Sequence, residues 1–345
     1  MRNGPPAVTV IYGLAPPHEV VWDLSSAGGC TVERRNMRLE IPPLDKVDIR
    51  LLRVFKAVTE CNGFAAAEET LGLGRSTISI HISDLETRFG LKLCVRGPSG
   101  FSLTPQGQIV YEATLRLFSE INSFRTTVAG SKGQLMGELT IWQMENIASD
   151  PLNPLVGALR RFRERSNGVE ITMNVVPSND VERGVYDGRC DLGLTGSRTP
   201  LNGLKYEQAY SEKITLYCGS KHPLFDRAEN TLSDDDLRQV DFVRRGFVTR
   251  EQEMVETSWN STVVSMHVEA TLEFILTGLH VGYLPDQYAA AWVDLGVLRK
   301  INPERFSVNW PVYIVSRESN APSVLVSTFR DDLLSESRCL EGVDI

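Results

Sequence analysis

The sequence lacks any long run of apolar residues. Across its 345 residues, polar and charged side chains interrupt each hydrophobic stretch before it reaches the roughly 20 residues of a membrane-spanning helix. Residues 1–17 also lack the basic segment and sustained apolar core of a secretory signal peptide. We therefore expect a cytoplasmic protein with no membrane partner.

Cysteine and histidine are scarce and scattered. No cysteine forms a Cys-x-x-Cys pair, and none neighbours one of the five histidines at metal-ligand spacing. The six cysteines are Cys30, Cys61, Cys94, Cys190, Cys218 and Cys339. This pattern argues against a zinc site or a disulfide framework, and we expect neither a metal nor another cofactor.

An excess of basic charge is missing as well. The net charge of −8 argues against a protein that is coated by nucleic acid over its whole surface. Residues 45–107 carry eight basic and seven acidic side chains, so any DNA-binding charge there must be segregated onto one face.

The most informative segment is residues 62–107, which contains an unusual amphipathic helix. Its apolar face is formed by Ile78, Ile82, Leu85 and Phe89 at helical spacing. The opposite stripe is small and rich in hydroxyl groups, and consists of Ser76, Ile80 and Ser83, with Arg75, Thr77, Ser79 and His81 beside it. Small polar side chains allow a helix to lie deep in the major groove of DNA and contact base edges.

The surroundings of this helix indicate a winged helix-turn-helix. A short alanine-rich helix is expected over residues 64–71, followed by a break at Gly72–Gly74. Spacing alone fits an ordinary helical hairpin equally well. Residues 93–103, however, are typical of two strands joined by a turn, which is a wing. Thr104 and Pro105 then predict the N-cap and first residue of a long helix.

Residues 62–107 resemble the DNA-binding domain of LysR-type transcriptional regulators, and the resemblance continues more weakly to the C-terminus. The matching residues are Phe64, Ala67, Glu69, Leu71, Ser76, Ile78, Ser79, Ile82, Leu85, Glu86, Gly90, Leu93, Arg96, Leu103, Thr104 and Gly107. The resemblance implies that residues 75–83 read double-stranded promoter DNA and that Arg96 holds phosphate.

Three positions depart from the family pattern. Ala65 stands where the family usually has a hydroxyl residue that caps the second helix, so a cap and a phosphate contact are expected to be lost. Ile80 replaces a frequent arginine and can press only on a thymine methyl group. Ser99 replaces a common basic residue of the wing.

A long helix is predicted over residues 106–128. Apolar residues recur every three or four positions, as in a helix that pairs with its own copy, at Val110, Ala113, Leu117, Ile121, Phe124 and Val128. The alternative is a helix packed on its own domain. The resemblance implies that residues 108–133 are a dimerisation linker, within a homodimer or homotetramer.

The N-terminal region, residues 1–44, is rich in glycine and proline and is expected to be a disordered extension. Met37 is the expected natural start, or else the extension is dispensable; a short regulatory arm is the alternative. The first helix is predicted over residues 48–61, with Asp48 as its N-cap.

Residues 134–345 alternate between strand and helix patterns, which predicts an α/β fold with a parallel sheet flanked by helices. Strands are expected at 139–144, 169–176, 191–195, 207–219, 242–245, 262–268, 281–284 and 308–316. Helices are expected at 151–165, 180–186, 232–238, 271–279 and 323–334. Residues 207–219 and 308–316 are expected to cross between two lobes, as in periplasmic-type solute-binding folds.

Ligands of such folds lie beyond the strand ends, beside helix N-termini. The predicted effector contacts are Asn146, Ser178, Asn179, Thr195, Gly196, Arg245, Phe247 and Thr271. These groups suit a small carboxylate, with Arg245 as a bidentate partner. Glu145 would repel an anion, so a cationic or zwitterionic effector is the alternative; equally, the polar groups could only satisfy strand and helix ends.

These observations favour a transcription regulator that binds DNA and a small effector, with RNA polymerase as a further partner. An enzyme is a second hypothesis, but no G-x-S-x-G, P-loop or G-x-G-x-x-G pattern supports catalysis. A bare solute-binding protein would leave residues 45–107 unexplained. A redox-sensing regulator using Cys190 and Cys218 is a sharper variant, although buried cysteines usually act as small hydrophobic residues. His222, in a Lys-His-Pro-Leu element, is interpreted as a turn residue.

Overall fold

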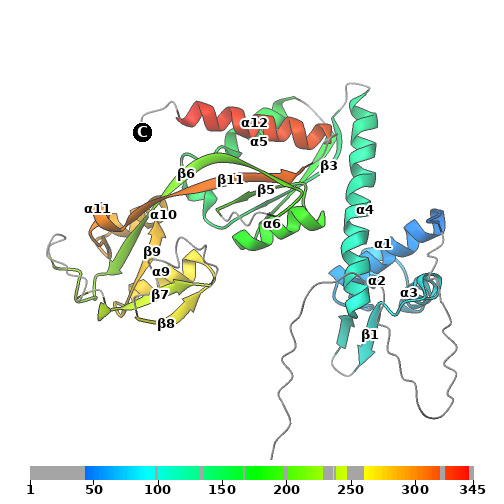
Figure 1. The fold of residues 1–345 in the computed structure, drawn as a ribbon, viewed down its shortest axis with the longest axis horizontal. Coiled ribbons are helices and arrows are strands. Elements are labelled where there is room, and N and C mark those ends of the chain that lie inside the picture. Colours follow the sequence, from blue (N-terminus) through cyan, green and yellow to red (C-terminus); the bar gives the residue numbers. More distant parts are fainter. Residues whose placement is uncertain are drawn as a thin grey trace, which may run out of the picture. The chain divides into compact units, whose positions relative to one another are not determined.

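The computed structural model contains a helix-turn-helix unit, a long helix and a two-lobed α/β region (Figure 1). It describes residues 43–97, 100–131, 135–165, 168–196, 201–227, 236, 238–246, 260–318 and 323–341. The predicted helix at 232–238 and the predicted extension at 1–44 fall almost wholly outside these residues.

The first helix, α1 (Lys46–Glu60), begins earlier than the sequence predicted. Its N-cap is Asp45, whose carboxylate accepts hydrogen bonds from the backbone of Val47 and Asp48. Asp48 lies at the third helical position and accepts from the Asp45 backbone N–H, which completes a capping box. The prediction of Asp48 as the N-cap was therefore wrong, because two aspartates three residues apart satisfy each other's backbone groups.

The winged helix-turn-helix follows the predicted order. Its remaining elements are α2 (Ala66–Leu71), α3 (Arg75–Phe89), β1 (Cys94–Gly97) and β2 (Gly100–Leu103). Ala65 gives α2 no side-chain cap, as predicted. Next comes α4 (Pro105–Gly130), where Thr104 accepts from the Gly107 N–H at 2.8 Å, which confirms the predicted cap.

Lobe I alternates strands and helices. Its elements are β3 (Met136–Gln143), the short turn η1 (Ile147–Ser149), α5 (Leu155–Glu164), β4 (Gly168–Val175), α6 (Ser178–Asp187) and β5 (Leu192–Thr195). The strands β3, β4 and β5 are parallel, as the alternating pattern predicted.

Lobe II is smaller. Its described elements are β7 (Asp241–Arg245), β8 (Asn260–Ser265), α9 (Val268–Leu276), β9 (His280–Pro285), α10 (Asp286–Asp294), β10 (Leu298–Lys300) and α11 (Pro303–Phe306). The predicted strand at 262–268 ends at Ser265, and the predicted helix at 271–279 begins at Val268. Thr271 is therefore one turn inside α9 rather than at its start.

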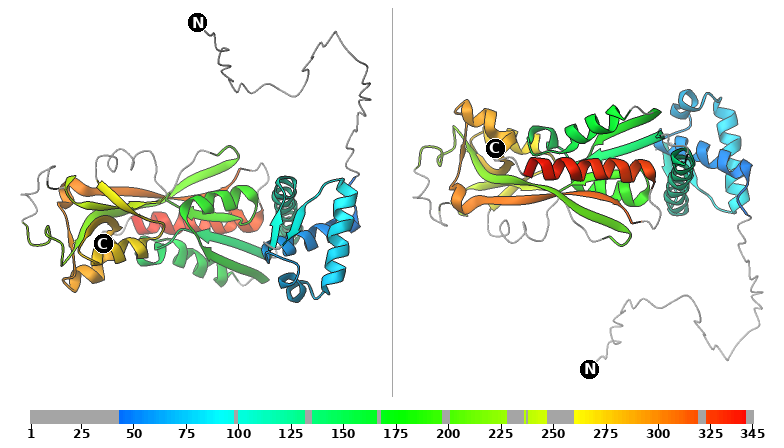
Figure 2. Two further views of the ribbon diagram at one scale, coloured as in Figure 1. Left: turned by 90° about the horizontal axis from the view of Figure 1, so that it is seen from below. Right: turned by 90° about the horizontal axis from the view of Figure 1, so that it is seen from above.

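Two long antiparallel strands connect the lobes, as predicted (Figure 1). They are β6 (Leu204–Gly219) and β11 (Ser307–Arg317), and their register shifts between Val312 and Tyr313. All lobe strands thereby join one sheet in the order β4-β3-β5-β11-β6-β9-β7-β8, with β10 paired to β6. The last helix, α12 (Val324–Glu341), packs on α5 and β6 (Figure 2).

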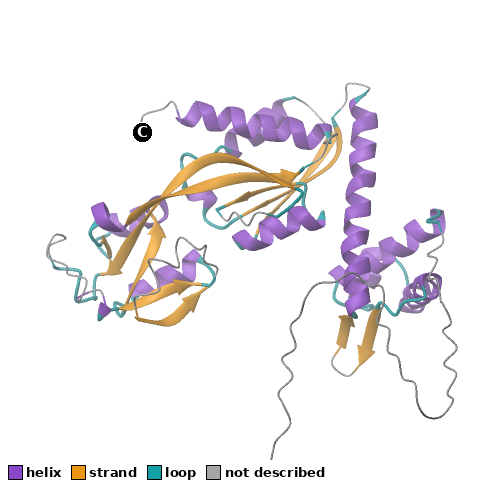
Figure 3. Ribbon diagram, in the orientation of Figure 1, coloured by secondary structure: helices purple, strands orange, loops and turns teal. Residues whose placement is uncertain are grey.

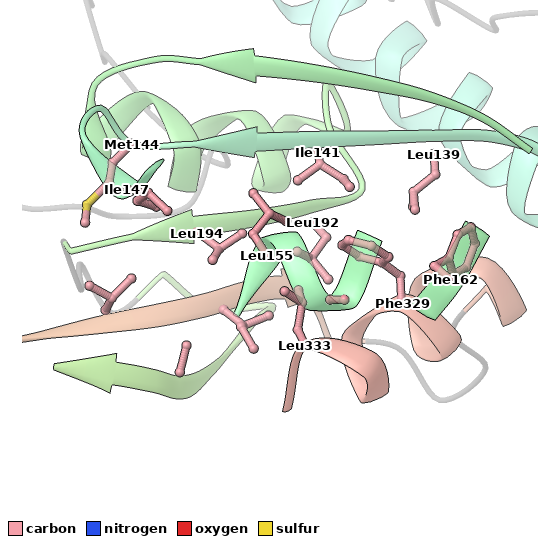
Figure 4. Close-up of a cluster of buried hydrophobic side chains, with 14 of the residues drawn as sticks. Leu139, Ile141, Met144, Ile147, Leu155, Phe162, Leu192, Leu194, Phe329 and Leu333 are labelled. Carbon is pink, nitrogen blue, oxygen red and sulfur yellow. The ribbon is translucent and has the colours of Figure 1, made fainter. Parts of the chain in front are cut away.

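Helices cover both faces of the lobe I sheet (Figure 3), and a hydrophobic layer lies on each face. One layer lies beneath α5 and α12, where the rings of Phe162 and Phe329 meet edge to face at 5.4 Å (Figure 4). The other lies beneath α6 and includes Val181, Val185 and Cys190. Among the described residues, none of the helices combines the length and apolarity required to cross a membrane.

Gly107 fixes where α4 meets the wing. A Cβ atom at Gly107 would lie 1.8 Å from the carbonyl oxygen of Leu93, far inside contact distance. The same carbonyl accepts a hydrogen bond from the Thr104 backbone at 3.0 Å, so it cannot move away freely.

We therefore expect Gly107→Ala to destabilise this unit by about 3 kcal/mol, at the high end for overpacking. Urea unfolding of the full-length chain, followed by circular dichroism, measures the change. Gly168→Ala is the control, because its nearest neighbour is 3.8 Å away. Equal unfolding midpoints for the two variants would contradict the assigned contact.

Candidate DNA-binding face and effector site

The helix α3 has one buried face and one exposed face. Ile78, Ile82 and Leu85 are buried in the core that α1 also lines. On the opposite side Ser76 and Ser83 are exposed, and Ile80 is 59% exposed, an unusual value for isoleucine. The predicted outer stripe is therefore available for contact.

The flanking predicted DNA contacts are less uniform. Arg75 is exposed, whereas Thr77, Ser79 and His81 are half-buried. The Nδ1 atom of His81 is buried and has no hydrogen-bond partner in the part of the chain that the structure describes. Of these side chains, Arg75 is the most accessible to a ligand.

Two carboxylates hold α3 against its neighbours. Glu68 of α2 accepts the Arg75 backbone N–H at 2.6 Å, which replaces the cap that Gly74 cannot supply. Glu86 accepts the backbone N–H groups of Leu93 and Cys94, at 2.9 and 3.3 Å. The start of the wing is thus fixed relative to α3.

Basic residues of this unit serve different purposes. Arg88 pairs with Asp48, which is fully buried, and with Asp45 at 2.8 Å. Lys92 pairs with Glu86. Arg96 lies in β1 opposite Phe101, and Ser99 falls outside the described residues. The charges of Arg88 and Lys92 are therefore neutralised by ion pairs within the domain.

The predicted dimerisation residues lie on two sides of α4. Val110 and Leu117 pack against the helix-turn-helix core, and Ile121 is half-buried. Ala113 is exposed, Phe124 is 70% exposed and Val128 is 45% exposed. The sequence allowed either pairing with a second copy or packing on the helix's own domain. Val110 and Leu117 pack on their own domain, whereas Phe124 and Val128 present an exposed apolar surface.

Three consecutive residues after β3 form the centre of the candidate effector site. They are Met144, Glu145 and Asn146, and each contacts a different element. Together with Glu212, Arg245, His267 and Val268 they are called the lobe junction below.

Met144 contacts two of the predicted effector-binding residues, Ser178 at the start of α6 and Gly196 after β5. Its sulfur accepts from the Gly196 N–H at 3.0 Å and from the Ser178 hydroxyl at 3.5 Å. Thr195 is buried beside them and donates to the Ser178 carbonyl at 3.1 Å. The structure therefore brings these three predicted residues together around a thioether.

Glu145 connects lobe I to lobe II. Its carboxylate pairs with Arg245, lies 2.7 Å from His267 Nδ1 and accepts the Val268 N–H at 2.9 Å. A carboxylate at the start of α9 is favourable because helix N-termini carry partial positive charge. The anion-binding groups of lobe II are thus bound to a side chain of the protein itself.

Arg245 is committed on both of its terminal nitrogens. One binds Glu145, and the other donates to the buried hydroxyl of Thr271 at 3.2 Å. Its fork is therefore not presented to a ligand in this arrangement. Asn179 is exposed at the start of α6, and Phe247 falls outside the described residues.

Asn146 adopts a left-handed backbone conformation with φ of +66°. Its amide nitrogen donates to Glu212 of β6 at 3.3 Å, and its oxygen accepts from Ser149 at 2.8 Å. Burial, and then the charge of Asp150, raise the pKa of Glu212 to about 8. The Glu212 side chain therefore changes between its neutral and its charged form near pH 8.

Sequence reasoning missed Glu212, Met144 and His267. The sequence did hold a signal for Glu212. It lies on the same inward side of its strand as Tyr210 and Leu216, and a carboxyl group is rare at such a buried position. Glu145, His267 and Glu269 also place ligand atoms within 4.8 Å of one another. Glu145 is already engaged by Arg245 and Val268, so we assign no metal there.

Comparison with known proteins identifies the chain. Residues 132–338 match the LysR substrate binding domain, and residues 49–108 match the bacterial regulatory helix-turn-helix protein, lysR family. The chain belongs to the LysR family. It is a transcription regulator with a DNA-binding helix-turn-helix and an effector-binding domain.

Curated relatives agree with this assignment. The HTH-type transcriptional activator BauR of Pseudomonas aeruginosa is 38% identical over 283 residues, which cover 82% of this chain and 93% of BauR. The probable HTH-type transcriptional regulator LrrA of Synechococcus elongatus is 28% identical over 74% of this chain and 89% of its own.

Solved LysR-type structures share the fold. The full-length regulator CbnR in complex with its target DNA has a TM-score of 0.57 at 20% identity, covering 84% of this chain and 99% of CbnR. ArgP from Mycobacterium tuberculosis has a TM-score of 0.56 at 16% identity, covering 83% and 96%.

The two cysteines considered for redox sensing are core residues in this LysR regulator. Cys190 packs with Val181 and Val185, and burial followed by the charge of Asp191 raises the pKa of its thiol. Burial also raises the pKa of Cys218 to about 12. Reactive thiols need a lowered pKa and access, so these cysteines are unfavourable sensors.

A thiol-reactivity experiment tests this placement. At pH 8 we expect the native wild type and the Cys190→Ser/Cys218→Ser variant to show the same number of fast-reacting thiols. The buried pair should react about a thousandfold more slowly than an ordinary cysteine, because so little thiolate forms. After denaturation the variant should have two fewer thiols, measured with Ellman's reagent. Loss of a fast thiol in the native variant would contradict the burial.

Proposed function

We propose that this regulator binds promoter DNA as a homodimer through α3 and the wing, and that a small effector binds at the lobe junction. The observation that supports DNA binding best is the exposed stripe of Ser76, Ile80 and Ser83 on a helix whose other face is buried. Small side chains permit close approach of the helix to base edges.

The two kinds of contact in this proposal have different roles. Ser76 and Ile80 read the major groove, where isoleucine favours a thymine methyl group over a polar base edge. Arg75 and Arg96 neutralise phosphates and position the domain without reading sequence. We further propose that the protein works in the cytoplasm, catalyses no reaction and contacts RNA polymerase at its promoters.

At the lobe junction, an effector competes with contacts that the protein already makes. A ligand carboxylate would have to displace Met144 from Ser178 and Gly196, or Glu145 from Arg245 and Val268. Displacement of Met144 rearranges lobe I beside the start of α6. Displacement of Glu145 instead changes what holds the two lobes together, because Arg245 and Val268 belong to lobe II. Effector binding would thereby alter the lobe angle and the bend of bound DNA.

Substitutions on α3 and the wing test the DNA-binding face. We expect Arg96→Ala to weaken binding to all sequences and to make the log–log salt slope shallower by about one, because one phosphate contact is lost. Ser76→Ala and Ile80→Ala should instead change preference between operator variants by about 1–3 kcal/mol per base pair. Gel shifts and fluorescence anisotropy over a salt series measure both effects.

Arg160→Ala is the matched control for the arginine, since its side chain is 81% exposed and, among the described residues, forms an ion pair with Glu164 alone. It should leave affinity and salt slope unchanged. If all three DNA-face variants behave like this control, α3 and the wing are not the DNA-binding surface.

The exposed apolar side of α4 tests the dimer. We expect Phe124→Glu to raise the dimer dissociation constant at least about tenfold, because it would bury an unpaired charge in the helix pair. Binding to a palindromic operator should fall with it, since two recognition helices are needed in register. Sedimentation velocity measures the first effect and gel shift the second.

Val156→Glu provides the control, because Val156 is 71% exposed on α5 and Phe124 is 70% exposed on α4. It should sediment as wild type. A dimer that survives Phe124→Glu unchanged would place the interface elsewhere.

A further inference from the structure

Glu212 is a buried carboxyl group with no ion-pair partner in the part of the chain that the structure describes. Its exposure is 4%, and its hydrogen-bond partner is the Asn146 amide. Among the residues that the structure describes, no basic side chain lies within ion-pair distance of it. Arg245 acts on it only at longer range. A buried carboxylate without a cation is costly, so such groups often mark binding sites.

Two further acceptors surround it. Asp150 is 5% exposed, and its carboxylate accepts the Leu152 N–H at 2.8 Å. Tyr210 is 2% exposed, and its hydroxyl has no hydrogen-bond partner among the described residues. Tyr210 lies two residues before Glu212 on the same side of β6. Asp150 ends the short turn η1 that Asn146 begins, and Asn146 is bonded to Glu212, so the three groups gather at one place. After burial itself, the charges of Glu212 and then Asp150 raise the pKa of the Tyr210 phenol, which agrees with this arrangement.

We propose that the effector carries an ammonium group, and that Glu212, Asp150 and Tyr210 receive it beneath Asn146. This inference rests on the proposed effector site at the lobe junction. A primary ammonium has three N–H donors and no acceptor, which matches three side chains that can all accept. It would also supply the positive charge that two buried carboxyl groups lack.

The same surroundings disfavour an anion at this position. Glu212, Asp150 and Glu145 are all acidic, and Arg245, whose charge acts on Glu212, is paired with Glu145. The Ser178 hydroxyl at the start of α6 and the Gly196 N–H after β5 are already bound to Met144, and the Val268 N–H at the start of α9 is bound to Glu145. A carboxylate on the same effector would have to bind at those groups, several bonds away from the ammonium.

Ammonium binding at Glu212 would be linked to pH. The ionisable groups acting on Glu212 are Asp150 and Glu145 from the segment after β3 and Arg245 from β7, and Tyr210 lies beside it on β6. With a pKa of about 8, Glu212 is mostly protonated at pH 6.5 and must release its proton to pair with a cation. Affinity for an amine should therefore rise with pH from 6 to 8, by up to about tenfold per unit.

The experiment compares three probe series on the full-length protein. They are ω-amino acids of two to six carbons, unbranched carboxylic acids of the same lengths and the corresponding primary alkylamines. Thermal shift identifies binders, and isothermal titration calorimetry in two buffers of different ionisation enthalpy counts released protons. We expect at least one amino probe to bind, with close to one proton released at pH 6.5.

Glu212→Gln should lower the affinity for amino probes at least about tenfold and abolish the pH dependence, since an amide cannot ionise. Tyr210→Phe, which removes only the phenol oxygen, should lower affinity about threefold and keep the pH dependence. Glu207→Gln is the control on the same strand, because Glu207 pairs with Lys205 and should not affect the probes.

The outcomes separate this inference from the proposed effector site. Absence of binding by every amine, or equal amine affinity in wild type and Glu212→Gln, overturns the ammonium assignment. Binding of carboxylic acids alone that is lost in Asn146→Gly also overturns it, but supports the lobe junction as the site. Glycine is chosen there because it tolerates the positive φ of Asn146. Amine binding unchanged in both Glu212→Gln and Asn146→Gly overturns the lobe junction itself.

Discussion

The contact between Glu145 and lobe II is the constraint on which the effector domain depends. One carboxylate satisfies a guanidinium, an imidazole and the first N–H of α9, all of them from the opposite lobe. Its neighbours Met144 and Asn146 are thereby directed toward the start of α6 and toward β6. The backbone at Asn146 adopts a left-handed conformation where the chain passes from β3 into η1.

In this arrangement the candidate effector site is a closed network of internal contacts, and it does not present an open set of groups to a ligand. The polar groups expected to bind an anion are present, but each has an internal partner. Free energy gained from an effector must therefore exceed that of the contacts it replaces, which ties binding directly to a change in the protein. A ligand that binds two conformations of the protein equally tightly would not change the balance between them.

The fold was largely predictable, because it depends on local patterns. The alternation of strands and helices, the Thr104–Pro105 start of α4 and the two faces of α3 all follow from spacing and capping. The errors lie at element ends. At α1, Asp45 and Asp48 could each act as the N-cap. At α9, the local sequence around residue 266 favours a strand, but the helix starts early because the carboxylate of Glu145, 122 residues before His267, stabilises its first turn. No local signal carries that contact.

The candidate site was only partly predictable for the same reason. Residues at strand ends could be placed near the junction by topology alone, and Ser178, Thr195 and Gly196 do meet. Their partners could not be assigned, because Met144 looks like a core residue and Glu145 like an obstacle to an anion. Glu212 was detectable only as a carboxyl group on the inward side of a strand, which needs the strand register to be recognised.

The continuous sheet has a mechanical consequence. Because β6 and β11 remain hydrogen-bonded along their shared length, the lobes cannot swing on loose loops, and rotation between them must twist a two-stranded ribbon. The register shift between Val312 and Tyr313 interrupts the ladder at one point, and such irregularities bend strands locally. Any rotation between the lobes must therefore deform this pair of strands, most easily at the register shift. Small rotations leave the hydrogen bonds between β6 and β11 intact, whereas large rotations require some of them to break.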